Sequence, residues 1–430
     1  MTTSPEHDAL RAAVLADPDD DLPRLVFADW LDESGDPDRA RFVRSQVALA
    51  ALPEWDPRAV ALRRTQSDWN VSQSMHRDLP TLSADRGLHW VAQDLFRRGF
   101  GHYAQVPILQ ALQRELPRLL HAVPIRRLGL YGATLEQWKE FAASPWLPSI
   151  REIDFDGIGV PSEAMRELCA SPGTTGIRAL RFRSCVSHAM PVVLEQLWLS
   201  PLGRQLETLE MAQALAGDNF YFTEFLEAFH GGAERLKSLK LQSMGFGRNH
   251  LHRFFTSRSW KLEELVIADE GGPPGVDYFG YPDCWPELRT VRFDGVNVNF
   301  ESPKRLADSL LAPHLTVLDL ANSSLHPEAV RELCRADHLA RLRIVRLRRM
   351  RIGNRSLRYL ILSRFWKNLV ELDLRGNPID DNGAKQLLQR RPPPELELLR
   401  IDRTVSDDTA EALNSHYRGN VVFEEMAGSN

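Results

Sequence analysis

The chain has 430 residues, enough for two or three ordinary domains or for one extended array of repeats. Its hydrophobic fraction of 43% and charged fraction of 26% are those of folded soluble proteins, which argues against a disordered chain. The formal net charge of −5 is small and excludes a surface that is basic throughout, as general nucleic-acid binding would require.

The N-terminus lacks a basic start followed by an apolar run, so no secretory signal is expected. No stretch approaches ~18 consecutive apolar residues, so a membrane span is not expected either. The four cysteines are too widely spaced for a CxxC metal knuckle, and they are Cys169, Cys185, Cys284 and Cys334. These features favour a reduced, cytoplasmic protein.

Residues 8–50 predict three short helices, which we assign to a small all-α domain of residues 1–55. Apolar residues at helical spacing mark the helices: Leu10, Val14 and Leu15; Leu22, Leu25, Val26, Ala28, Trp30 and Leu31; and Phe42, Val43, Val47 and Leu49. Four segments carry a family resemblance: DPDDD (17–21), PRLVFADWL (23–31), GDP (35–37) and RFVRSQ (41–46). They resemble the repeat-companion domain, an uncharacterised bacterial module often found ahead of repeats. The resemblance implies a bacterial protein and no particular activity.

The acidic run of residues 17–21 lacks the glycine and the terminal glutamate of a DxDxDGx5E calcium loop. Acidic residues just before Pro23 are better explained as N-capping groups that complement the dipole of the second helix. A metal site and an exposed acidic docking face are the less favoured alternatives.

Between residues 52 and 90 the periodic pattern weakens, and several prolines interrupt it. A strand around Phe100–Val106 and a helix from about Ile108 to Ala122 then predict a degenerate first repeat. Arrays need such a unit to cover their terminal core face. We therefore assign residues 56–124 to linker helices and the N-terminal cap of a solenoid.

From residue 125 onward one pattern recurs, as in LVELDLRGNPI (369–379), where apolar residues stand at the first, fourth and sixth positions. The first positions are Ile125, Ile150, Ile177, Leu206, Leu236, Leu262, Leu288, Leu315, Leu342, Leu369 and Leu396. Successive intervals lie between 25 and 30 residues, and the last four are 27 residues each. A period this steady is typical of a solenoid.

The second half of each unit has helical spacing. Offsets of 15, 18 and 19 residues from the first position give Met165, Leu168 and Cys169; Val330, Leu333 and Cys334; Leu357, Leu360 and Ile361; and Ala384, Leu387 and Leu388. Residues at i, i+3 and i+4 share one helix face, so each unit is predicted to be a strand followed by a helix. Cys169 and Cys334 are then core positions of helices, and Cys185 occupies a turn.

This pattern resembles leucine-rich repeats in their long, ribonuclease-inhibitor-like form. The resemblance implies an α/β solenoid, a horseshoe of about 11 strand–helix units over residues 125–430, with residues 420–425 closing its C-terminal end. The family usually has Asn or Cys at the turn after the strand, and here only Cys185 and Asn377 match. Since the other units must satisfy the turn backbone without that side chain, we expect irregular turns in them.

The residues between the two strand leucines are expected to form a column on the concave face: Gly129, Asp154, Arg181, Glu210, Lys240, Val266, Arg292, Asp319, Arg346, Asp373 and Arg400. Opposite charges are adjacent almost throughout, which indicates pairing between strands ~4.8 Å apart. A column that neutralises itself keeps an exposed sheet soluble without recognising anything. Arginine is in excess only near the C-terminus, and there Arg346, Arg348, Arg375 and Arg400 are predicted partner-binding residues, suited to carboxylate or phosphate.

The unit ADEGGPPGVDYFGYPDCWPE (268–287) has glycines, prolines and aromatic residues where other units have a helix. Its Tyr278, Phe279, Tyr281 and Trp285 form a second candidate partner-binding site, because exposed aromatic residues on loops often dominate binding. Alternatively, these side chains fold back over the core that the missing helix leaves uncovered.

No catalytic residue, metal site or cofactor is predicted. NHLH (249–252) lacks a third ligand at a recognised spacing, and GFGRN (245–249) has too few glycines to cradle a phosphate. The GxSxG, GxxxxGK[ST] and HExxH motifs are absent from the sequence.

These patterns favour a non-enzymatic, monomeric scaffold that binds another protein through the concave face or the 268–287 loop. Related repeats include activators of small GTPases and inhibitors of ribonucleases, so regulation of an enzyme is an alternative that fold analogy alone supports. The other alternative is an anionic partner or a nucleic acid bound through the C-terminal arginines. A nucleic acid is the less favoured of the two.

Overall fold

The structure is a computed structural model that describes residues 4–66, 79–82, 88–91, 94–107, 115–131, 134–157, 160–185, 190–212, 233–244, 261–268, 287–295, 314–322 and 325–424. Two compact units are distinguished: a first unit of residues 1–54 and 61–206, and a second unit of residues 55–60 and 207–430.

The first unit begins with the three predicted helices, α1 (Pro5–Ala16), α2 (Leu22–Glu33) and α3 (Pro37–Ala51). Their apolar faces bury one core made of Val14, Phe27, Ala28, Leu31, Ala40, Val43, Val47 and, from the strand region, Phe100. Gly35, with φ +86°, ends α2 in the left-handed conformation that glycine adopts without strain. The prediction of an N-terminal helical region is confirmed.

The strands of the first unit come next in the chain and pair with one another. A short hairpin pairs β2 (Phe96–Arg97) with β3 (Phe100–Gly101), and the main sheet runs β1 (His89–Trp90), β4 (Tyr103–Pro107), β5 (Arg127–Tyr131), β6 (Glu152–Asp156) and β7 (Ala179–Arg183). Only β1 is antiparallel in the main sheet. β4 pairs in parallel with β5 and is followed by α6 (Glu115–Ala122), an arrangement that fits the predicted degenerate first repeat, and the role of this unit as a cap stays a prediction.

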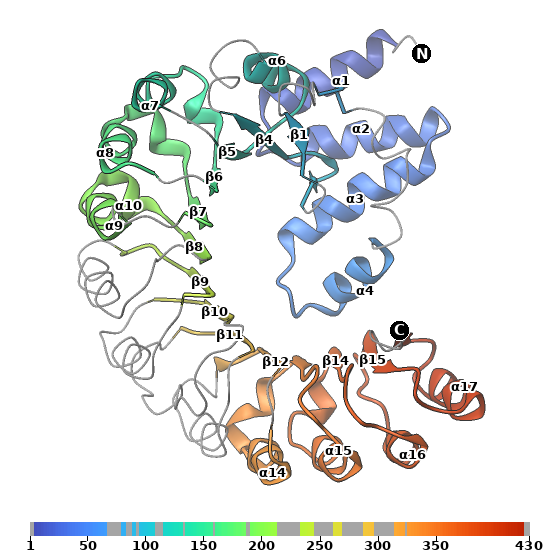
Figure 1. Cartoon of the computed structure of the whole chain (residues 1–430). Helices are drawn as coiled ribbons and strands as arrows, with labels where there is room; N and C mark the ends of the chain where they lie inside the picture. Colours follow the sequence, from blue (N-terminus) through green and yellow to red (C-terminus); the bar gives the residue numbers. More distant parts are fainter. Residues whose placement is uncertain are drawn as a thin grey trace. The chain divides into compact units, whose positions relative to one another are not determined.

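The remaining helices of the first unit are α7 (Leu135–Ala142), α8 (Ser162–Ala170), α9 (Met190–Leu199) and α10 (Pro201–Gln205), with 3₁₀ turns η3 (Leu147–Ser149) and η4 (Pro172–Gly176). Figure 1 shows α7, α8 and α9 on one side of β5, β6 and β7. A further helix, α4 (Pro57–Gln66), begins with residues of the second unit and continues into the first.

The second unit has nine described strands: β8 (Thr208–Ala212), β9 (Ser238–Gln242), β10 (Glu264–Ala268), β11 (Thr290–Asp294), β12 (Val317–Ala321), β13 (Ile344–Arg346), β14 (Glu371–Asp373), β15 (Leu398–Asp402) and β16 (Val421–Glu424). Each is parallel to its neighbours. The last strand lies in the segment predicted to close the array.

Helices α14 (Pro327–Arg335), α15 (Asn354–Ile361), α16 (Asp381–Leu388) and α17 (Asp407–His416) alternate with the C-terminal strands, as do the 3₁₀ turns η6 (Asp337–Arg341) and η7 (Trp366–Asn368). Figure 1 shows these helices on one side of β12, β14 and β15. Parallel strands that alternate with helices confirm the α/β solenoid. No helix in the described part of the chain combines the length and the apolar character of a membrane span.

The registers confirm the predicted concave column within each unit. In the first unit Gly129, Asp154 and Arg181 are successive partners. In the second unit the succession is Glu210, Lys240, Val266, Arg292, Asp319, Arg346, Asp373 and Arg400. The residues that flank each column position point the other way and are buried, as Leu318 and Leu320 are.

The turns after the strands share one geometry, contrary to the irregular turns that we expected. The residue before the usual Asn or Cys position has φ between 48° and 70° in Gly157, Ser184, Ser243, Gly295, Asn322, Arg349 and Gly376. In five of these units its N–H donates to a carbonyl at the end of the next strand or two residues beyond it, as Asn322 donates to Arg348 at 2.9 Å. This repeated backbone bond satisfies the turn without a side chain, so the expectation was wrong for these units.

Two units do use the side chain that the family favours. Asn377 is 3% exposed; its Oδ1 accepts hydrogen bonds from the backbone N–H groups of Met350 and Ile352, and its Nδ2 donates to the carbonyls of Leu347 and Leu374. Cys185 is fully buried and its thiol donates to the carbonyl of Phe155.

The other two described cysteines lie in helix cores, as predicted. Cys169 and Cys334 are buried on the inner faces of α8 and α14. Burial raises the pKa of both thiols above the ordinary value, which keeps them in the unreactive thiol form.

Candidate functional site

The four arginines predicted to bind a partner come together on the concave face of the second unit. Arg346 and Arg400 lie in β13 and β15, and Arg348 and Arg375 follow β13 and β14 by two residues. We call these four residues the basic cluster.

Two members of the basic cluster are already engaged by carboxylates. Arg346 donates from Nε and Nη2 to the two oxygens of Glu371, at 2.7 and 2.9 Å, and its Nη1 lies 3.6 Å from Asp319. Arg375 donates to Asp373 at 2.6 Å and to Glu424 at 2.5 Å. The hydrogen bond to Asp373 raises the pKa of Arg375, which therefore stays charged.

The other two members are held more loosely. Arg348 Nη2 lies 3.8 Å from Asp319 Oδ1, and Arg400 Nη1 lies 3.9 Å from Asp373 Oδ2. Their side chains are 38% and 31% exposed. The Nε atoms of both arginines and Asp319 Oδ1 are buried and have no hydrogen-bond partner. Because their side chains are partly exposed and their ion pairs are long, Arg348 and Arg400 are the members that can still donate to an incoming group.

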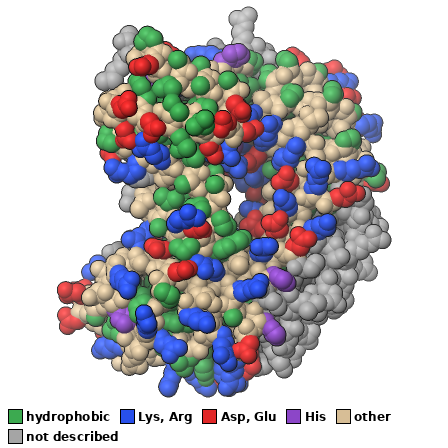
Figure 2. Space-filling model, turned by 180° about the vertical axis from the view of Figure 1, so that it is seen from behind, with side chains coloured by type: hydrophobic (Ala, Val, Ile, Leu, Met, Phe, Trp, Pro, Cys, Tyr) green, Lys and Arg blue, Asp and Glu red, His purple; other side chains and the backbone are tan. Residues whose placement is uncertain are grey.

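Asp319 lies beside Arg346 and Arg348 and is 7% exposed. Burial raises the pKa of its carboxyl group, and the nearby guanidinium groups of Arg346 and Arg348 oppose that rise. Together with Glu424, Asp319 also reduces the excess of positive charge that the sequence pattern indicated. Figure 2 shows that acidic and basic side chains are interspersed over the visible face and are not segregated into one patch.

The concave face of the first unit carries a more deeply buried ionic network. Asp154 is 0% exposed and accepts hydrogen bonds from Tyr103 Oη at 2.8 Å, from Arg127 Nη2 at 2.6 Å and from Arg181 Nη1 at 3.2 Å. Arg127 also lies with its guanidinium 4.0 Å from the ring centroid of Tyr103. The alternating column predicted Asp154 and Arg181, but nothing in the repeat pattern marked Tyr103 or Arg127.

Glu152 joins the same network. It accepts a hydrogen bond from Arg97 at 2.7 Å, and Arg181 lies 2.7 Å from its other oxygen. Burial favours a higher pKa for Glu152, but the adjacent His102, Arg181 and Arg97 outweigh it and hold the pKa well below its ordinary value. Such a saturated network is suited to holding the sheet together and has little capacity left for a ligand.

The depressed pKa of Glu152 predicts an acid-dependent loss of stability. A carboxyl group whose folded pKa is lowered stabilises the fold above its unfolded pKa of ~4.3, and the contribution is lost as the pH falls below that value. In urea unfolding of the first unit, Glu152→Gln should therefore cost at least ~2 kcal/mol at pH 7, and this difference from the native chain should shrink between pH 5 and pH 3. The exposed Glu136→Gln should show no such trend. A difference for Glu152→Gln that is constant with pH would contradict the prediction.

The acidic run has a tertiary role that sequence reasoning missed. The N-cap of α2 is Asp21, which makes no side-chain capping hydrogen bond, so the predicted N-capping was wrong in this respect. The preceding Asp20 Oδ1 accepts from the N–H of Leu22 at 3.0 Å. Asp19, however, pairs with Arg126 at 3.2 Å and with Arg151 at 3.1 Å. Although partial burial favours a higher pKa for Asp19, these two arginines lower it. The run thus ties α2 to the start of the repeats inside the first unit.

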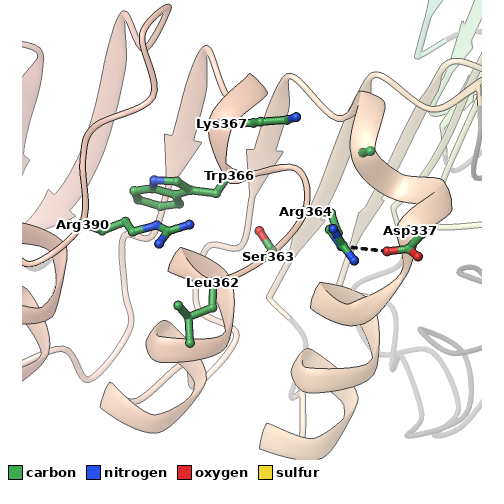
Figure 3. Close-up of a pocket in the computed structure, with 8 residues that line it drawn as sticks. Asp337, Leu362, Ser363, Arg364, Trp366, Lys367 and Arg390 are labelled. Carbon is green, nitrogen blue, oxygen red and sulfur yellow. Dashed lines mark ion pairs between the residues drawn. The ribbon is translucent and has the colours of Figure 1, made fainter.

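A pocket of about 560 Å3 opens in the second unit (Figure 3). It is lined by Asp337, Ala340, Leu362, Ser363, Arg364, Trp366, Lys367 and Arg390. Arg364 Nε pairs with Asp337 at 2.9 Å, and the indole of Trp366 donates to the carbonyl of Arg391. Three successive repeats supply the walls, so no local sequence motif could have marked this pocket.

The second predicted site cannot be placed. Tyr278, Phe279, Tyr281 and Trp285 lie outside the described residues, as do NHLH (249–252) and GFGRN (245–249). Across the described ranges, His, Cys, Asp and Glu side chains nowhere gather into a group of three suited to a metal ion.

Comparisons with known proteins bear on the family. A family model described as "Leucine Rich repeat" matches residues 367–388. NACHT, LRR and PYD domains-containing protein 5 of Homo sapiens is 26% identical over 314 residues, which cover 66% of this chain and 25% of that protein. The chain thus spans only a quarter of that relative's length.

A chain in the crystal structure of the yeast Rad7–Elc1 complex is 13% identical, with a TM-score of 0.50. The match covers 99% of this chain and 94% of that chain, and at this identity it shows a likeness of fold alone. The assignment of residues 1–55 to the repeat-companion domain stays a prediction. The matched residues 367–388 contain the buried Asn377 and one complete strand–helix unit of the steady period, so this part of the chain is a leucine-rich repeat.

Proposed function

We propose that the chain is a non-enzymatic, monomeric and cytoplasmic scaffold that binds another protein through the concave face of its second unit. The basic cluster of Arg346, Arg348, Arg375 and Arg400 is the proposed contact. The 268–287 loop with Tyr278, Phe279, Tyr281 and Trp285 is retained as a second contact.

One observation carries this proposal. Arg348 and Arg400 are about one-third exposed, and the nearest carboxylate oxygens, of Asp319 and Asp373, lie 3.8 Å or more from their guanidinium nitrogens. A guanidinium group presents several donors in one plane and binds a carboxylate with two parallel hydrogen bonds. The arrangement therefore suits an acidic side chain or a chain-terminal carboxylate of a partner protein.

The comparisons are consistent with a protein partner, since the yeast structure is that of a complex between two proteins. A nucleic-acid partner is less well supported. Asp319, Glu371, Asp373 and Glu424 surround the four arginines and leave little net positive charge for a phosphate backbone. No specific contact favours enzyme regulation over simple binding.

Affinity capture from a lysate of the source organism tests the proposal with a matched pair of variants. Arg348→Gln with Arg400→Gln should lower the yield of a captured protein at least ~10-fold, because two charge-assisted contacts are removed from the interface. Glutamine avoids the like-charge repulsion that glutamate would create beside Asp319 and Asp373.

Arg355→Gln with Arg358→Gln is the control. It makes the same change in charge on the exposed side of α15 and should leave the capture intact. Equal capture by both variants would move the contact away from the basic cluster.

A further inference from the structure

A row of side chains at the start of the strands lies beside the charged column on the concave face. Its members in the second unit share one register: Thr208, Ser238, Glu264, Thr290, Val317, Ile344, Glu371 and Leu398. Each stands two residues before its column residue and so points to the same face. The row is polar from β8 to β11 and becomes largely apolar from β12 onward.

The apolar end of this row is covered by a segment from far away in the sequence. Val60 is 1% exposed and belongs to one buried cluster with Val317, Ile344, Val370 and Leu398. Trp55 and Val422 pack against the same cluster. We call these four array residues, together with Val422, the apolar row, although Val370 precedes the row member Glu371 by one residue and Val422 pairs with the column residue Arg400. Residues 55–60 are the clasp.

The clasp is short and locally ordered. It belongs to the second unit, although the residues on both sides of it belong to the first. Asp56 accepts a hydrogen bond from the N–H of Arg58 at 2.9 Å at the start of α4. The Arg58 side chain is the main cause of the lowered pKa of Asp56, and Arg343 of the array contributes as well. The clasp thus offers an aromatic residue, an acidic residue and an aliphatic residue within six positions.

An apolar row on a concave face would be a liability if it were left open to water, because exposed contiguous apolar surface favours association. The chain covers it with two side chains from a segment that is not part of the repeat pattern. The neighbouring Arg346 and Arg348 belong to the proposed partner surface, so a protein that binds there meets the clasp as well.

We propose that the apolar row is a docking surface for an aromatic–aliphatic peptide segment, and that the clasp occupies it as an intramolecular competitor. The preferred partner segment has the chemistry of the clasp: a tryptophan, an adjacent aspartate and a valine five residues after the tryptophan. This inference rests on the proposed function, because a competitor has meaning only if the concave face binds proteins.

The test uses the full chain and a fluorescein-labelled synthetic peptide of residues 52–66, with binding followed by fluorescence anisotropy. The receptor variant Trp55→Ala with Val60→Ala removes the two clasp side chains that cover the apolar row, so that the row is open to the peptide. The peptide should bind this variant and should bind the native chain at least ~10-fold more weakly, since a tethered competitor acts at a millimolar effective concentration. The same peptide with Trp55→Ala and Val60→Ala should bind neither chain.

A second receptor variant localises the contact. Ile344→Gln, added to the Trp55→Ala and Val60→Ala chain, should abolish peptide binding while circular dichroism shows an unchanged fold. No binding of the native-sequence peptide to the Trp55→Ala and Val60→Ala chain would overturn the docking surface, and so would equal binding of the altered peptide. Equal affinity for that chain and the native chain would overturn the competition.

The peptide experiment is independent of the capture experiment. Peptide binding depends on the apolar row, whereas the proposed function depends on Arg348 and Arg400. If the peptide does not bind but capture depends on Arg348 and Arg400, the docking surface has failed and the proposed function stands. If the peptide binds but capture does not depend on these arginines, the proposed function has failed.

Discussion

Replacing Asp154 with alanine should lower the free energy of unfolding of the first unit by about 3–5 kcal/mol. The carboxylate is 0% exposed and accepts hydrogen bonds from Tyr103, Arg127 and Arg181. Its removal leaves the guanidinium of Arg127, only 5% exposed, buried beside a vacated site. Arg127 keeps an ion pair with Asp94 at 3.1 Å but loses its closest carboxylate. Removing a partner from a buried charge costs far more than the intact pair stabilises. Urea unfolding followed by circular dichroism measures the change.

Glu136→Ala provides the matched control for this substitution. Glu136 is 81% exposed and pairs with Lys139 across one helical turn, so its loss should cost no more than about 0.5 kcal/mol. Asp154→Asn, which keeps an acceptor but removes the charge, should fall between the two. A cost below about 1 kcal/mol for Asp154→Ala would show that water or side-chain movement compensates Arg127.

Asn377→Ala is the second substitution for which we expect a large effect. It should lower the free energy of unfolding of the second unit by about 3–5 kcal/mol. The side chain makes two hydrogen bonds as acceptor, from Met350 and Ile352, and two as donor, to Leu347 and Leu374. All four partners are backbone groups, and each buried group left unsatisfied costs about 1–3 kcal/mol, partly recovered when the turn relaxes. Urea unfolding measures the loss, and hydrogen exchange of the Met350 and Ile352 amides should accelerate.

Asn382→Ala is the control for Asn377. Asn382 is exposed on α16, in the same repeat, and its substitution should change the stability by less than about 0.5 kcal/mol. Unchanged exchange of the two amides in Asn377→Ala would mean that the turn is held by the recurrent backbone bond alone.

The repeat and its core were predictable because they depend on local periodicity. The period identified the strands, and it also identified the buried faces of α8, α14, α15 and α16. Both follow because the direction of a side chain depends on its position within a regular element. The concave column followed for the same reason: strands in register place equivalent residues side by side, as Asp319 and Arg346 are. The 27-residue spacing also identified Asn377 as the turn residue.

The irregular turns were predicted wrongly because only side chains were considered. The backbone N–H of the residue before the turn position donates to the next strand in five units, whatever side chain follows. Such a bond has no sequence signature, since Gly157, Ser243 and Arg349 all make it with the required positive φ.

The candidate site was predictable only in outline. Sequence placed the four arginines on one face, but it could not show that Arg346 and Arg375 are saturated while Arg348 and Arg400 are not. That distinction depends on side-chain geometry and on Glu424, which lies 49 residues from Arg375 in the chain.

By itself, the sequence determined the repeat unit, the order of its strands and helices, and which residues face the core, because each of these follows from spacing within about thirty residues. Only the tertiary structure decided the pairing of Asp19 with Arg126 and Arg151, and the contact of Trp55 and Val60 with the apolar row. These contacts join segments separated by roughly one hundred or more residues, and side chains that meet across such distances leave no periodic trace in the sequence.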